Sequence, residues 1–128
     1  IEWIDYDISQ EYTLTADMQI NILCTAPAGI RSLTVSIISE TLDVTEAGLP
    51  ASFDLANISD PELIGILGEG GFEFPINDKV KNQTEVPFSI TPFVSLLMNF
   101  EGLHKFQLEM TDNNGQTVTE TVQLRVIL

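Results

Sequence analysis

Few residues of this chain have side chains suited to catalysis. His104 is the only histidine and Cys24 the only cysteine. An alternating run begins at His104 and continues with Phe106, Leu108 and Met110, which puts the histidine on the inward face of a predicted strand. This position favours a structural histidine at the edge of the core over a functional one. Because no Ser/His/Asp grouping is suggested by spacing, we expect no nucleophilic hydrolysis and no enzyme activity.

Cys24 ends a second alternating run, which also contains Met18, Ile20 and Ile22. We therefore expect its thiol to be buried and chemically inert. A single cysteine can form neither an internal disulfide nor a cysteine-based zinc site. It fits a reducing compartment, and equally a secreted domain whose core is large enough to need no bridges.

Calcium is the metal that the acidic residues would suit best, because hard cations bind clustered carboxylate oxygens. Asp5 and Asp7 lie on the same side of the first predicted strand, and Asp112, Asn113 and Asn114 form a polar loop. The loop lacks the glycine and glutamate positions of an EF-hand. Turn chemistry alone explains residues 112–115, so we predict no metal site and no cofactor.

Three other patterns give weak signals. Trp3, Tyr6 and Tyr12 could form an aromatic platform for a sugar. The glycine-rich residues 68–71 lack the lysine and Ser/Thr of a phosphate-binding loop and indicate the end of a helix. Carboxylate pairs for glycoside hydrolysis are not excluded by counting, but a sandwich of 128 residues lacks the deep cleft such enzymes use. We assign no catalytic, metal or cofactor residue, and we leave open which residues would bind a ligand.

Length, composition and charge narrow the class of protein. The 128 residues fit a single domain, and 44% hydrophobic against 19% charged residues excludes a disordered chain. Five basic and nineteen acidic residues give a net charge of −14, which opposes binding to nucleic acid and to anionic membrane surfaces. No apolar run is long enough for a membrane-spanning helix.

Most of the secondary structure that the sequence predicts is β-strand. Period-two alternation predicts strands over residues 2–8, 15–25, 31–39, 85–90, 103–111 and 116–127, with a turn at 26–29. Residues 40–81 lose this alternation and predict a helical crossover. Within it, 43–49 could form one or two helical turns, and Ser59 to Glu62 begins a helix that glycines from Gly68 onward end.

The last two predicted strands allow a test of register. A two-residue turn would set the apolar face of one strand against the polar face of the other. A three-residue loop, 113–115, instead pairs Met110 with Val118 and is the arrangement we predict. It leaves Glu120 opposite Leu108, which indicates a bulge or an edge position.

Residues 91–100 carry more apolar side chains than one amphipathic stripe needs. Thr91 and Pro92 predict a helix start, and Phe93, Leu96, Leu97 and Phe100 share one face, while Val94 and Met98 lie away from it. This segment could plug an open end of the sandwich or dock a partner domain. We favour the plug, because the segment joins consecutive strands.

Strands without a βαβ rhythm predict a mainly β fold, an antiparallel β-sandwich with short helical insertions in its crossover connections. Five segments also carry a family resemblance: residues 1–7 (IEWIDYD), 26–30 (APAGI), 88–94 (FSITPFV), 102–106 (GLHKF) and 111–119 (TDNNGQTVT). In these the chain resembles the PKD-like, immunoglobulin-like domains of surface lipoproteins from gut Bacteroidetes. The long helical middle departs from a minimal domain of this type.

The resemblance implies that residues 1–128 are a single immunoglobulin-like domain, a fragment of a longer exported protein. It implies a non-enzymatic structural or presentation module at the cell surface, in an outer-membrane lipoprotein or a secreted protein. The alternative is a carbohydrate- or protein-binding (adhesion) module. Its partners would be neighbouring domains of the same chain, with a glycan or a surface protein as further candidates, and neither nucleic acid nor direct membrane insertion. No functional residue carries over from the family.

Overall fold

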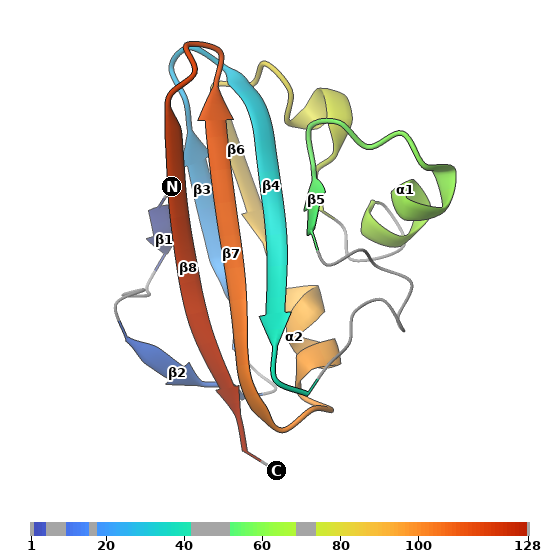
Figure 1. Ribbon diagram of the computed structural model, residues 1–128, viewed down its shortest axis with the longest axis vertical. Helices are drawn as coiled ribbons and strands as arrows, with labels where there is room; N and C mark the ends of the chain where they lie inside the picture. Colours follow the sequence, from blue (N-terminus) through green and yellow to red (C-terminus); the bar gives the residue numbers. More distant parts are fainter. Residues whose placement is uncertain (1, 5–9, 16–17, 42–51, 69–73, 128) are drawn as a thin grey trace.

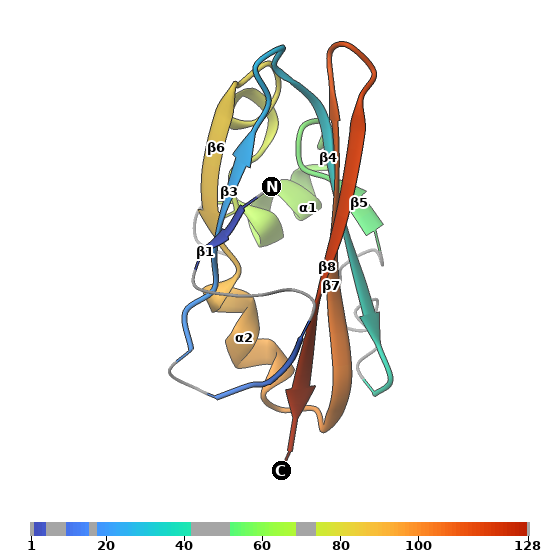
Figure 2. The same cartoon turned by 90° about the vertical axis from the view of Figure 1, so that its left-hand side faces the viewer.

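The computed structural model describes residues 2–4, 10–15, 18–41, 52–68 and 74–127. It is mainly β, with two sheets that face each other as in a sandwich (Figures 1 and 2). The first sheet has the order β1-β3-β6, with bounds Glu2–Ile4, Asn21–Thr25 and Glu85–Ser89. The second has the order β2-β8-β7-β4-β5, with bounds Glu11–Thr13, Thr117–Val126, Gly102–Asp112, Ile30–Ser39 and Ser52–Asp54.

The long hairpin β7–β8 confirms the predicted register. Met110 pairs with Val118, and the ladder continues without a shift to Gly102 and Val126. Gly115 in the connecting loop has a φ of +82°, the left-handed conformation that this loop type requires. Glu120 does pair with Leu108, and the ladder shows no bulge there. The structure favours the edge explanation, because among the described residues β2 pairs with residues 123–125 alone and no strand pairs with the outer side of β8 at Glu120.

The helices fill the side and the lower end of the sandwich. Helix α1 (Pro61–Leu67) begins as predicted, with the Asp60 carboxylate accepting a hydrogen bond from the Glu62 amide at 3.0 Å. Helix α2 (Thr91–Leu97) lies between the two sheets at their lower end in Figure 2. Val94 and Leu97 are each 2% exposed, and Met98 packs against the core, which supports the plug interpretation. A short 3-10 helix, η2 (Asn77–Lys79), precedes β6.

The core lies between the sheets and is formed by alternate residues of the strands. Leu33, Val35 and Ile37 of β4 face inward, as predicted from their spacing. Cys24 is fully buried on β3, again as predicted. Strand β4 begins directly after a tight turn in which the Gly29 amide donates to the Ala26 carbonyl. Gly29 has a φ of +89°, which glycine adopts without strain.

Several predictions of local structure were wrong. The sandwich is not purely antiparallel, because β2 pairs parallel with β8. A strand of three residues is too short to show the alternation from which a strand can be predicted. The second strand begins at Asn21, since Met18 instead forms a turn with Thr15. Thr91 does not cap α2, because its hydroxyl accepts a hydrogen bond from the Ile20 amide. Val118 is 43% exposed at the open sheet edge, although it lies on the inward face.

Candidate functional site

His104 is buried more deeply than predicted, at 1% exposure, between the end of β4 and the end of α2. Its Nε2 lies 2.8 Å from the Phe100 carbonyl oxygen, and its Nδ1 lies 2.6 Å from the Ser39 hydroxyl. A carbonyl oxygen can only accept, so Nε2 must carry a proton and donate it. In the neutral ring, Nδ1 then accepts from Ser39, whose oxygen accepts in turn from the Thr41 amide.

This Ser39–His104 contact is a serine–histidine pair that spacing did not reveal, because the two residues lie on different strands. The register Ser39↔His104 of the β4–β7 ladder brings them together. Both ring nitrogens are used within the fold, one by a hydroxyl and one by a backbone carbonyl. The contact therefore links β4, β7 and the chain after α2, and its geometry leaves no ring nitrogen directed at a substrate.

The Cys24 thiol lies in the core of the sandwich. Burial in this apolar setting raises its pKa to about 11, well above the ordinary value of 9.0. The thiolate, which is the reactive form, is therefore scarce near neutral pH.

In the acidic loop considered for calcium, backbone amides of the loop already bind the Asp112 carboxylate. One carboxylate oxygen of Asp112, Oδ1, accepts from the amides of Asn114 and Gln116, at 3.0 and 2.9 Å. This is the turn chemistry that the sequence predicted. Asp5 and Asp7 lie outside the described residues. Across the described ranges, no three His, Cys, Asp or Glu residues are grouped so that they could hold a metal ion.

The aromatic and glycine-rich patterns are only partly described. Tyr12 is half-buried and packs against the core, so it offers no flat exposed ring. Tyr6 and the side chain of Trp3 lie outside the described residues, as do residues 69–71 of the glycine-rich stretch. Gly68 does follow α1, and its amide donates to the Ile64 carbonyl at the end of the helix.

The strongest candidate site is on the outward side of the five-stranded sheet, which we call the outer face. On β7 and β8 every second residue points outward, because the alternate positions are buried in the core. The outer face consists of Ser32, Thr34, Ser36 and Ile38 of β4, Leu103, Lys105, Gln107, Glu109 and Thr111 of β7, and Thr117, Thr119, Thr121, Gln123 and Arg125 of β8.

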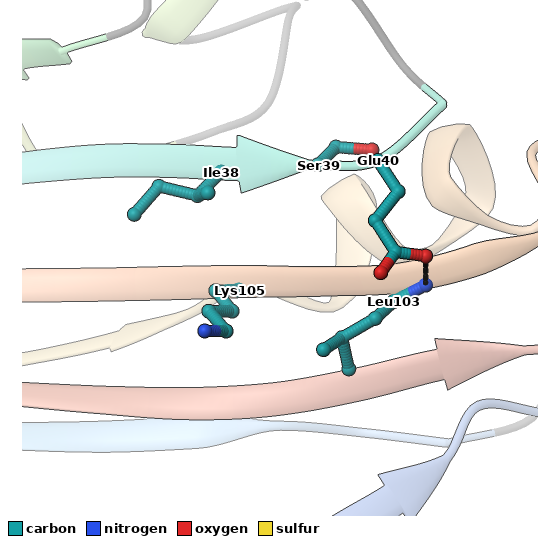
Figure 3. Close-up of a pocket in the computed structure, with 5 residues that line it drawn as sticks. All are labelled: Ile38, Ser39, Glu40, Leu103 and Lys105. Atoms are coloured by element: carbon teal, nitrogen blue, oxygen red, sulfur yellow. Dashed lines mark hydrogen bonds between the residues drawn. The ribbon is translucent and has the colours of Figure 1, made fainter.

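A hollow of about 160 Å³ lies at the lower end of the outer face (Figure 3). It is lined by Ile38, Ser39, Glu40, Leu103 and Lys105. The Glu40 carboxylate accepts from the Leu103 amide at 3.2 Å, which holds it against the start of β7. The side chain of Ile38, which is 53% exposed, lies at the hollow. The hollow therefore combines aliphatic side chains with the ammonium group of Lys105 and the carboxylate of Glu40.

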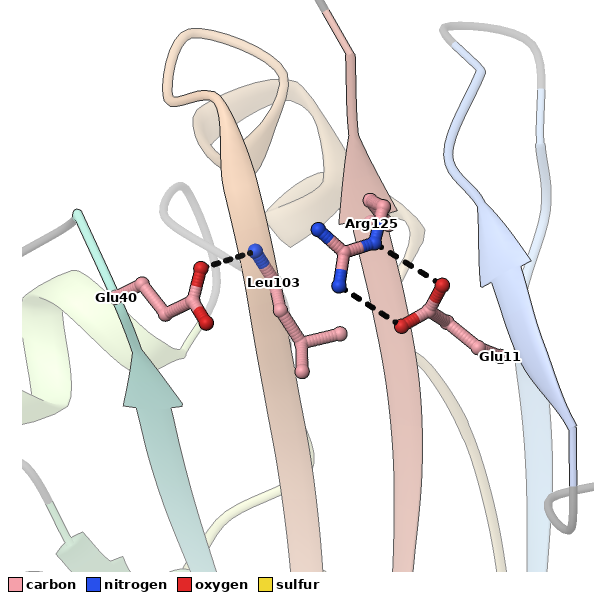
Figure 4. Close-up of polar contacts among 4 residues, drawn as sticks. All are labelled: Glu11, Glu40, Leu103 and Arg125. Atoms are coloured by element: carbon pink, nitrogen blue, oxygen red, sulfur yellow. Dashed lines mark hydrogen bonds and ion pairs between the residues drawn. The ribbon is translucent and has the colours of Figure 1, made fainter.

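An ion pair lies beside the hollow, between β2 and β8 (Figure 4). Arg125 donates twice to the Glu11 carboxylate, from Nε at 3.0 Å and from the guanidinium NH₂ at 3.2 Å. The hydrogen bond from Arg125 lowers the pKa of Glu11 and raises that of Arg125 itself. Because the pair is exposed, it contributes little to stability, although it links the parallel edge strand β2 to β8.

Sequence reasoning missed the hollow and the ion pair, since it singled out none of their residues. The alternation of β4 and β7 already placed Ile38 and Lys105 outward, which was the available signal. No signal linked Glu11 to Arg125, because the pairing of β2 was not predicted.

No protein-family model matches this chain, and neither a curated protein nor a solved structure shows a significant match. Among the described helices, none has the length and apolar character needed to cross a membrane.

Proposed function

We propose that this chain is a non-enzymatic, immunoglobulin-like module that spaces or presents neighbouring domains of a bacterial cell-surface protein. In immunoglobulin sandwiches the second and fifth strands share one sheet, and the third, sixth and seventh share the other. When β2 is left out of the count, β3 and β6 come second and fifth and share one sheet, and β4, β7 and β8 come third, sixth and seventh and share the other. β5 departs from this pattern, because it lies beside β4 instead of in the first sheet. This distribution of strands is the observation that carries the proposal.

The pattern of polar contacts supports a scaffold role. The only charged or polar residue fully buried in the described part, His104, is used to tie strands together. In that same part, no buried side-chain nitrogen or oxygen lacks a hydrogen-bond partner, which is the state of a well-specified fold. At the upper end, the Asn113 side chain donates to the Ala28 carbonyl and to Asn82, which joins three loops.

Replacement of the domain in its full-length protein tests this role. We expect deletion of residues 1–128 to impair display of the neighbouring domains on intact cells, measured by antibody labelling and added protease. An unrelated β-sandwich of similar size should restore display. If only the native domain restores it, spacing is not the function.

The adhesion alternative is tested on the isolated chain. A ligand that binds the folded state raises the thermal midpoint. We expect no change with a panel of soluble oligosaccharides at millimolar concentration. A saturable rise with one sugar would make the chain a carbohydrate-binding module.

A further inference from the structure

The outer face differs from the rest of this acidic molecule in its charge. The whole chain carries five basic and nineteen acidic residues. Lys105 and Arg125, two of those five basic residues, lie on the outer face, with Glu109 on the face and Glu11, Glu40 and Asp54 at its margin. Two basic residues thus lie among four acidic ones there, against three among fifteen in the rest of the chain. A second copy, also at −14, would be repelled less at this face than by the acidic remainder.

Two residues of opposite charge, Lys105 and Glu109, lie at equal distances on either side of Gln107, near the middle of β7. Gln107 lies in one row across the sheet with Ser36 and Thr121. Lys105 and Glu109 lie two residues to either side of this row, on the same side of the sheet. A twofold axis along the row would therefore place Lys105 of each copy opposite Glu109 of the other.

The same rotation gives compatible neighbours on β4. Thr34 pairs with Glu109 and Ile38 pairs with Lys105 in the β4–β7 ladder. The rotation therefore places the exposed side chain of Ile38 opposite the methyl group of Thr34. A face-to-face arrangement with the axis along the strands would instead set Lys105 against Lys105 and is disfavoured by like charge.

We propose that the outer face binds a second copy of this chain, with the Glu109 carboxylate of each copy paired with the Lys105 ammonium group of the other. The side chains of Ile38 and Leu103 beside Lys105 would shield this pair from water, while the Glu40 carboxylate in the same hollow is bound by the Leu103 amide (Figure 3). This inference goes beyond the proposed function and needs only the folded domain.

The area of the outer face fits a weak dimer. Strands β4, β7 and β8 have 10, 11 and 10 residues. At strand spacings of about 4.8 Å and about 3.4 Å per residue, they cover about 500 Å² per copy, or about 1,000 Å² in total. Specific interfaces of this size are at the small, transient end of the range. We therefore expect dissociation constants of about 10 µM to 1 mM.

A charge swap on the 128-residue chain tests the proposal. We expect sedimentation equilibrium to show a monomer–dimer equilibrium, and Lys105→Glu or Glu109→Lys to weaken it at least about tenfold. The double variant should restore association to about the original value. Residues 105 and 109 are about 13 Å apart along one extended strand, so this rescue cannot come from a contact within one chain.

Lys81→Glu is the matched control, because it makes the same charge change at an exposed residue away from the outer face. It should leave association nearly unchanged, and circular dichroism should show every variant folded. A chain that stays monomeric to about 1 mM, or a dimer indifferent to Lys105→Glu, would overturn the proposal. So would a double variant that stays monomeric, or an outer face that binds only a different protein.

Discussion

At the scale of single residues, polar side chains in this protein serve to join segments that are distant in sequence. The Ser39–His104 contact joins β4 to β7, and the Nε2 bond to Phe100 extends the link to the chain after α2. Alternation placed His104 on the inward face, but it could not supply its partners. The partner Ser39 depends on the register between β4 and β7, and other residues of the two strands determine that register.

Removal of the Ser39 hydroxyl should be costly for this reason. Ser39→Ala leaves Nδ1 of a buried ring without a donor, so the free energy of unfolding should fall by about 1–3 kcal/mol. Ser36→Ala is the control, because its hydroxyl contacts Ser52 on the exposed side of the sheet. That change should stay within about 0.5 kcal/mol. If urea unfolding shows the same loss of unfolding free energy for Ser39→Ala and Ser36→Ala, the buried contact contributes no more to stability than the exposed one.

The Cys24 thiol should give stability a specific dependence on alkaline pH. Its folded pKa of about 11 is above the ordinary value of 9.0. The unfolded chain therefore loses this proton first, and the thiol's contribution is full below pH 9 and is lost as the pH rises to about 11. The difference in unfolding free energy between the native chain and Cys24→Ala should fall by about 2–3 kcal/mol over that window.

Other titrating groups occur in both proteins and cancel in this difference. The same burial should protect the native thiol from a thiol reagent at pH 7 until the chain unfolds. Rapid modification of the folded protein would show that β3 is placed in the wrong register.

At the scale of elements, the sequence predicted local pairings well and distant ones poorly. The β7–β8 register followed from two adjacent alternating runs and a loop whose Gly115 accepts a positive φ. The helix start at Asp60 followed from capping chemistry. By contrast, β2 and β5 have three residues each, too few to show a period, and they are fixed by the long strands beside them. The outer face could be read from alternation, but its hollow needed the β4–β7 register.

Helix α2 should contribute strongly to stability because it closes one end of the core. Leu97 is 2% exposed, so Leu97→Ala should cost about 2–5 kcal/mol as a cavity. Met98→Asp would bring a charge against the core and should destabilise the domain strongly. Leu96→Ala, at a partly buried position, should cost less and serves as the control. A stable Met98→Asp variant that loses binding to another domain would make α2 a docking surface instead.

At the scale of the whole molecule, the net charge of −14 acts against the folded state. Repulsion among the carboxylates opposes the compact state, and salt screens it over about 10 Å at 0.1 M. The one ion pair found in the described part, between Glu11 and Arg125, is exposed and contributes little to offset this repulsion. Raising the NaCl concentration should therefore raise the thermal midpoint.

Calcium should do no more than NaCl at the same ionic strength. The Asp112 carboxylate is held by backbone amides, and its turn needs no ion to form. We expect identical thermal midpoints with excess chelator and after dialysis, and equal rises with calcium, magnesium and NaCl at matched ionic strength. The measurement reports on the whole chain, including Asp5 and Asp7. A rise of several degrees that is specific to calcium would show a bound ion, because a ligand held only by the folded state must stabilise it.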